Sequence, residues 1–74
     1  MNNNNNNMTQ LNYTYEQLKG KTVFISLMED NGEGGYDESI EGRHINSLLD
    51  YQELELTISN YDNMGILDEY WVVE

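Results

Sequence analysis

The imbalance of charge constrains this chain more than any other feature of its sequence. Its 74 residues hold 14 Asp and Glu against 3 Lys and Arg, a formal net charge of −11. Every acidic residue lies between Glu16 and Glu74, so the charge belongs to the part that can fold. Nucleic acids and anionic membranes are bound through Lys and Arg. The sequence therefore predicts no direct binding to either, and attraction to basic protein surfaces.

The length and composition of the chain limit the kinds of fold, metal site and location that it can have. At this size one core supplies only about 3–5 kcal/mol of stability. The chain has no cysteine and one histidine, which excludes disulfides, thiolate zinc sites and histidine-rich metal sites. Its apolar runs, residues 23–25 among them, are far shorter than the ~20 residues of a membrane helix. Met1 is followed by six asparagines rather than by a secretory signal pattern, so a cytoplasmic location is expected.

The composition divides the chain into two parts. Residues 1–10 include the run from Asn2 to Asn7, which has no apolar group to bury and predicts a disordered Asn-rich tail. Residues 11–74 carry the apolar patterns and all the acids, and predict a single small acidic domain.

The first half of the domain contains clear local signals. Thr14 and Gln17 have the spacing of a capping box, and Gly20 is well placed to end the short helix that would follow. The residues expected on its common face are Leu11, Tyr15 and Leu18. Residues 22–28 are mostly β-branched or apolar, with Val23, Ile25 and Leu27 on one face, which predicts a central strand. Asn31-Gly32 predicts a hairpin turn after it. A second strand is expected near residues 39–49, although residues 48–51 also fit a helical turn.

The second half predicts another hairpin. Residues 53–59 alternate with period two, so Leu54, Leu56 and Ile58 would face a core from a strand. Residues 60–65 would form a turn, and residues 66–73 a last strand. Together these elements predict a mainly β protein with a short N-terminal helix, either a twisted four-stranded antiparallel sheet or an SH3-like or Sm-like small barrel. An α+β open sheet is the alternative.

Two groups of residues are candidates for binding a partner. The acidic segment has no Lys or Arg and comprises Glu29, Asp30, Glu33, Tyr36, Asp37, Glu38 and Glu41. A secondary group comprises Tyr61, Asp62, Asp68 and Glu69. Tyrosine is enriched at interfaces because its ring buries a large area while its hydroxyl stays polar. Carboxylates on one face of a strand repeat every ~6.6–7 Å, close to the spacing of successive phosphates along one nucleic-acid strand.

Catalytic and metal chemistry find little support in the sequence. A calcium-binding loop opening at Asp30 would need an oxygen ligand at its third position, where Gly32 stands. The glycine-rich segment has neither GxGxxG spacing nor a following Lys. His44 has no identifiable nucleophile or orienting partner. We therefore expect no enzyme activity, no catalytic residue, no cofactor and no metal site.

Two short segments resemble a known family. Residues 23–27, Val-Phe-Ile-Ser-Leu, with Asn31-Gly32-Glu33 behind them, resemble the opening strand and loop of ArdA-type antirestriction proteins. Residues 68–72, Asp-Glu-Tyr-Trp-Val, resemble a later segment of that family. The family's chains are longer and consist of several small domains, of which this chain could match the first. The resemblance implies a small acidic DNA mimic of phages and mobile elements that competes with DNA for a restriction or nuclease complex.

Two functional hypotheses follow. In the first, the chain is a non-enzymatic inhibitor that binds a basic nucleic-acid-binding surface of a host or defence protein, such as a restriction, CRISPR or other nuclease complex, as a DNA mimic. In the second, it is a small β interaction module or subunit that oligomerises or pairs strands with a partner through residues 70–73, and its acidity serves solubility alone. The chain would be a monomer or a homodimer.

Overall fold

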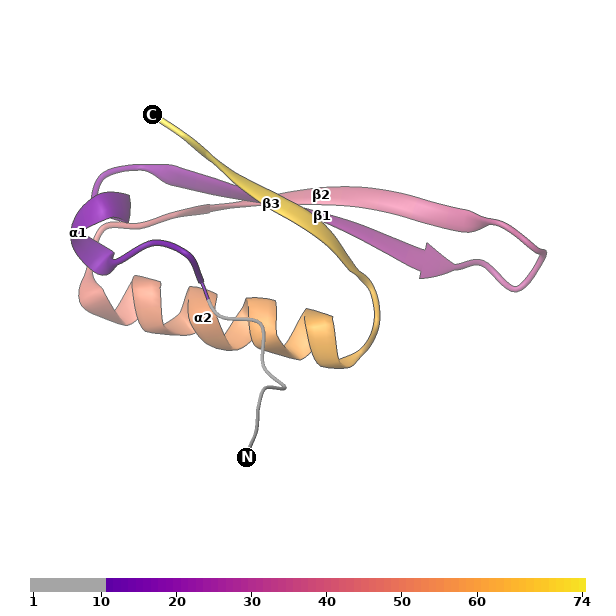
Figure 1. Cartoon of the computed structure of the whole chain (residues 1–74). Helices are drawn as coiled ribbons and strands as arrows, with labels where there is room; N and C mark the ends of the chain where they lie inside the picture. Colours follow the sequence, from indigo (N-terminus) through magenta and orange to yellow (C-terminus); the bar gives the residue numbers. More distant parts are fainter. Residues whose placement is uncertain (1–10) are drawn as a thin grey trace.

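The computed structural model describes residues 11–74 as a mainly β, open antiparallel sheet with two helices (Figure 1). The elements in chain order are α1 (Tyr15–Leu18), β1 (Thr22–Asp30), β2 (Tyr36–His44), α2 (Leu48–Asn63) and β3 (Leu67–Val73). The strand order is β2-β1-β3. The predicted tail, residues 1–10, lies outside the described residues.

The predicted N-terminal helix is confirmed as α1. The Thr14 hydroxyl accepts the backbone N–H of Gln17 at 3.3 Å, and the Gln17 side chain accepts the backbone N–H of Thr14 at 2.8 Å. Gly20 follows the helix with a φ of 81°, in the left-handed region that glycine adopts without steric cost. Leu18 is fully buried, and Leu11 and Tyr15 pack against the same core.

β1 is the central strand, as predicted. Val23, Ile25 and Leu27 alternate along it and are buried. β2 pairs with β1 along its whole length, from Thr22 opposite His44 to Asp30 opposite Tyr36. The first hairpin is therefore confirmed. Its second strand ends before the helix that begins at Leu48, so the predicted range of residues 39–49 overlaps only the latter part of β2.

The predicted strand over residues 53–59 is wrong, because these residues lie within α2. Leu54 and Ile58 are buried, but Leu56 between them is 63% exposed. Residues four apart lie on one face of a helix, so these two positions satisfy a helical period as well as an alternating one. Tyr51 and Tyr61 extend the same stripe and pack against the core. The alternative reading of residues 48–51 as a helical turn is confirmed, since they open α2.

The second predicted hairpin is also wrong, because β3 pairs with β1. The register runs from Thr22 opposite Val73 to Leu27 opposite Leu67, with a bulge at Ser26/Leu27. Residues 60–63 of the predicted turn belong to α2, and Gly65, with a φ of 77°, helps reverse the chain. The sheet described here is therefore three-stranded and open. It is neither four-stranded nor a closed barrel, and the α+β alternative is compatible with it.

The two faces of the sheet differ in what covers them. We call the face of Val23 and Ile25 the covered face, because their side chains pack against Leu54 and Ile58 of α2 in the single core cluster of the described residues. The opposite face, which carries Phe24, is called the uncovered face. No helix of residues 11–74 is long and apolar enough to cross a membrane.

The start of α2 depends on one side chain. The Ser47 hydroxyl accepts the backbone N–H of Asp50 at 3.2 Å and so caps the helix. Replacing a serine at this position by alanine typically costs about 0.5–2 kcal/mol. We expect Ser47→Ala to lower the free energy of unfolding by about 1 kcal/mol. Urea titration followed by circular dichroism measures this, and an unchanged midpoint would contradict the assigned cap.

Candidate protein-binding surface

The acidic segment forms a projecting arm. β3 meets β1 only as far as Leu27, so the β1–β2 hairpin continues beyond the rest of the sheet. We call residues 29–38 the hairpin arm (Figure 1). Six of the seven residues predicted for the main site lie in this arm. They are Tyr36 and five acids, Glu29, Asp30, Glu33, Asp37 and Glu38. The structure therefore brings six of the seven together.

The tip of the arm is organised by short side chains. The Asp30 carboxylate accepts the backbone N–H of Gly32 at 2.8 Å, and the Asn31 side chain accepts that of Glu33 at 2.8 Å. Gly32 and Gly34 have φ values of 79° and 84°, which the chain needs to turn between the strands. These contacts hold the tip while the Glu33 side chain stays exposed.

The strand register places acids against acids within the arm. Glu29 lies directly opposite Asp37, and like charges at such positions destabilise a sheet. Both side chains project on the covered side, whereas Asp30, Tyr36 and Glu38 project on the other side of the ribbon. The arm thus presents carboxylates on both faces, and Tyr36 is 66% exposed between them.

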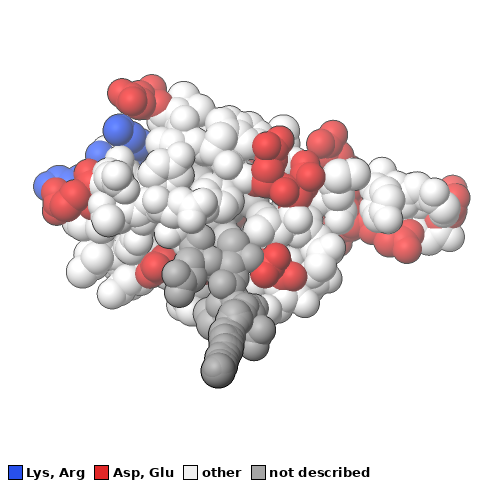
Figure 2. Space-filling model, viewed as in Figure 1, with Lys and Arg blue, Asp and Glu red and all other residues white. Residues whose placement is uncertain are grey.

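The charge is polarised along the molecule. Lys19 and Lys21 precede β1, and Arg43 lies near the end of β2, so all three basic residues are at the end away from the arm. Figure 2 shows Lys and Arg colour only at that end, next to some Asp and Glu colour, whereas the middle of the view and the arm carry Asp and Glu colour alone. Nothing within the arm neutralises its carboxylates.

Glu41 lies outside the arm, although the sequence predicts it as part of the same binding group. Its carboxylate accepts the Tyr61 hydroxyl at 2.6 Å and Arg43 Nε at 2.8 Å, and Arg43 Nη2 lies 2.6 Å from the same group. The Tyr61 hydrogen bond and the Arg43 charge lower the pKa of Glu41 despite partial burial. The hydrogen bond to Glu41, together with burial and the Glu41 charge, raises the pKa of Tyr61, and Arg43 opposes this effect. We call these residues the Glu41 cluster. It joins β2 to α2.

The secondary group is divided by the structure. Tyr61 lies in α2 rather than in a loop and is half-buried, with its hydroxyl on Glu41. Asp62 is exposed in the last turn of the same helix. Asp68 stands at the bulge of β3 and accepts the Ser26 hydroxyl at 3.2 Å, and Glu69 is exposed beside it. Asp62, Asp68 and Glu69 lie toward the base of the arm, where Met28 N–H donates to the Ile66 carbonyl.

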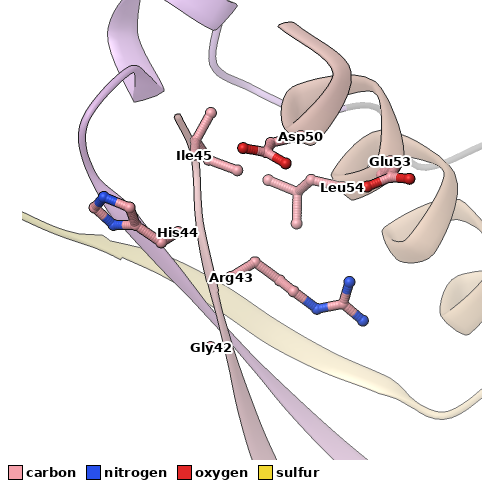
Figure 3. A pocket seen from close by; sticks show the side chains of 7 residues that line it. All are labelled: Gly42, Arg43, His44, Ile45, Asp50, Glu53 and Leu54. Carbon is pink, nitrogen blue, oxygen red and sulfur yellow. The ribbon is translucent and has the colours of Figure 1, made fainter. Parts of the chain in front are cut away.

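A shallow hollow of about 160 Å³ lies between β2 and the start of α2. Its lining consists of Gly42, Arg43, His44, Ile45, Asp50, Glu53 and Leu54. Figure 3 shows Arg43 extending toward α2, while the His44 ring points to the other side of its strand. There its Nδ1 is 2.9 Å from the Thr22 hydroxyl. The lining of the hollow thus contains one guanidinium and two carboxylates, and the Thr22–His44 contact lies on the other side of the strand.

Sequence reasoning missed the Glu41 cluster. Glu41 and Arg43 are two residues apart and so share one face of a strand, which was a usable signal. The sequence predicts a turn at Tyr61, whereas its contact with Glu41 requires the helix α2. Part of that helix, residues 53–59, is predicted as a strand.

Within residues 11–74, no group of three or more His, Asp and Glu side chains is arranged to hold a metal ion. Comparison of the chain with protein-family models, with curated proteins and with solved structures found no match.

Proposed function

We propose that this chain is a non-enzymatic inhibitor whose hairpin arm enters a basic nucleic-acid-binding groove of another protein and competes with nucleic acid there. A restriction, CRISPR or other nuclease complex is the class of target. The observation that supports this most is the arm itself, five carboxylates and an exposed tyrosine on a projecting two-stranded ribbon without a single Lys or Arg.

The geometry of the arm suits such a groove. Carboxylates on one face of a strand repeat every ~6.6–7 Å, and the register puts acids on both faces of the ribbon. A groove that binds a nucleic-acid backbone presents Lys and Arg to the phosphates. The ribbon also projects beyond β3, so it can enter a groove without the body of the domain.

The energetics favour a basic partner. The Glu29–Asp37 repulsion is present in the free protein and is relieved when cations approach. Long-range attraction raises the association rate and weakens with salt, whereas a buried aromatic anchor such as Tyr36 slows dissociation.

The test uses two triple variants that remove the same charge. The arm variant carries Glu33→Gln, Asp37→Asn and Glu38→Gln, and the control variant carries Glu16→Gln, Glu53→Gln and Glu55→Gln at exposed positions of α1 and α2, outside both predicted binding groups. The wild type and both variants are each immobilised and used to capture proteins from a nuclease-treated lysate of the cells that produce the chain. We expect wild type and control to retain a nucleic-acid-binding protein that added duplex DNA releases, and the arm variant to lose it.

Kinetics with the captured protein sharpen the test. We expect the arm variant to lower the association rate constant about tenfold or more at low salt and the control variant to change it much less. Equal losses in both variants would show that net charge alone acts, and retained proteins that ignore duplex DNA would overturn the proposal. Polylysine serves as a probe of unspecific attraction, which both variants should weaken equally.

A second candidate function, a β interaction module, is supported by the position of β3. β3 ends the described chain and lies at an edge of the sheet, where its outer backbone groups are free to pair with another strand. Sedimentation equilibrium distinguishes the two, because a tight homodimer favours strand pairing over the inhibitor.

A further inference from the structure

The uncovered face of the sheet carries an aromatic pair. The rings of Phe24 and Trp71 stack with centroids 5.9 Å apart and planes 26° apart. Phe24 also lies over Gly42, where an added Cβ would come within 3.0 Å of its ring. Two neighbouring strands thus hold Phe24 in place, and Trp71 remains 36% exposed.

Aliphatic side chains extend this pair across all three strands. Ile40 lies opposite Ser26 on the same face and is 58% exposed, and Val73 lies opposite Thr22 and is 43% exposed. Met28 continues the stripe toward the arm. On the covered face, by contrast, Val23 and Ile25 are completely buried. Contiguous apolar exposure of this kind marks interaction surfaces in soluble proteins.

The charge around this stripe has one sign. Glu38 lies on the uncovered face opposite Met28, and Glu69 lies opposite Ser26. Arg43 projects to the covered side with the Glu41 cluster, and Lys19 and Lys21 precede the sheet. The face therefore combines apolar contact area with carboxylates and presents no Lys or Arg of its own.

Neither a second copy nor the described start of the chain fits this face. A second copy would bring carboxylates against carboxylates on a chain of net charge −11. The start of the described chain is held on the covered side, where Asn12 N–H donates to the Tyr70 hydroxyl and the Tyr13 carbonyl accepts from the Tyr51 hydroxyl.

We propose that the uncovered face docks one amphipathic helix of a partner protein, with its apolar stripe on Trp71, Phe24 and Ile40 and with Lys or Arg along the flanks facing Glu38 and Glu69. Three strands span ~10 Å between the outer two, close to the ~10 Å diameter of a helix. The opposite face already takes a helix, α2, in the same way. This inference does not depend on competition with nucleic acid by the arm.

Trp71 is the only tryptophan of the chain and reports directly on the face. The probe is a synthetic Leu/Lys peptide of about 18 residues, or roughly five helical turns, with its leucines on one side. We expect a saturable one-to-one blue shift of Trp71 emission, together with induced helicity of the peptide. A peptide of identical composition in scrambled order should bind at least about fivefold more weakly because it presents no apolar stripe.

Matched substitutions locate the contact. Ile40→Gln removes an exposed aliphatic side chain from the uncovered face, and Leu56→Gln removes one from the exposed side of α2, both without changing the net charge. We expect about a fivefold loss of peptide affinity for the first and none for the second. Equal affinity of both peptides, equal effects of both substitutions, or a homodimer with Trp71 already buried would each overturn the inference. Because the readout involves no nucleic acid, failure here leaves the competition experiment on the arm intact.

Discussion

Leu54→Ala and Ile58→Ala are each expected to unfold most of the protein at room temperature. Both side chains are buried under the sheet from α2, with exposures of 1% and 0%. Truncating such a residue to alanine costs about 2–5 kcal/mol, and a core of this size supplies only about 3–5 kcal/mol. Urea titration followed by circular dichroism should show the transition moved to very low denaturant, or lost.

Leu56→Ala is the matched control. The same chemical change at a position that is 63% exposed should shift the free energy of unfolding by no more than about 0.5 kcal/mol, because the helix propensities of Leu and Ala are similar. A strand over residues 53–59 would bury all three side chains on one face and make the three losses comparable. Comparable losses would therefore overturn the assignment of α2.

The first half of the fold was predictable because its signals are local. The capping box of Thr14, the alternation in β1 and the Asn31-Gly32 turn each involve contacts within a few residues. Their energetics are set by the adjacent sequence, and the tertiary structure agrees with them. For these elements the structure differs from the prediction only in the residues at which the strands begin and end.

The second half was misread because two periods coincide there. Leu54 and Ile58 are compatible with either a strand or a helix, and Leu56 alone makes the pattern look alternating. The evidence for a helix lay at its start, in Ser47 before Leu48-Leu49, and in Tyr51 and Tyr61 at helical spacing from the buried pair. Once residues 53–59 form a helix, the strand that β3 was predicted to pair with is gone, and β3 pairs with the free edge of β1. The sheet then has three strands, too few for a four-stranded sheet or a barrel.

The candidate site was predictable in its charge and not in its contacts. The acids of the arm are close together along the chain, and a hairpin keeps neighbouring residues close in space, so the sequence was enough to group them. It could not separate Glu41, whose partner Tyr61 is 20 residues away along the chain. The uncovered aromatic face was also out of reach, since it depends on which strand lies beside Phe24.

The Glu41 cluster gives the second large prediction. Tyr61→Phe removes the hydroxyl that donates to the carboxylate at 2.6 Å, and Glu41→Gln removes the charge that both partners need. Hydrogen bonds to charged groups contribute about 1.5–3 kcal/mol when well buried, and this cluster is partly exposed. We expect each substitution to lower the free energy of unfolding by about 1 kcal/mol near neutral pH.

The pH dependence separates this cluster from general charge effects. The pKa of Glu41 is lowered from its usual 4.5, so its contribution is complete above that value and is lost as the pH falls through the folded pKa. The pKa of Tyr61 is raised from 10.0, so its contribution is complete below that value and is lost as the pH rises through the folded pKa. The stability difference between wild type and Glu41→Gln should therefore be flat between about pH 5 and 9 and shrink on either side.

Glu53→Gln is the control for this measurement, since it removes one negative charge from an exposed position of α2. In a chain of net charge −11, such a loss should be neutral or slightly stabilising through reduced self-repulsion. Glu41→Gln must act in the opposite direction if its carboxylate joins β2 to α2. Stabilisation by both substitutions would show that Glu41 is one more repelled acid, and that the hairpin and the helix are held together by the apolar core alone.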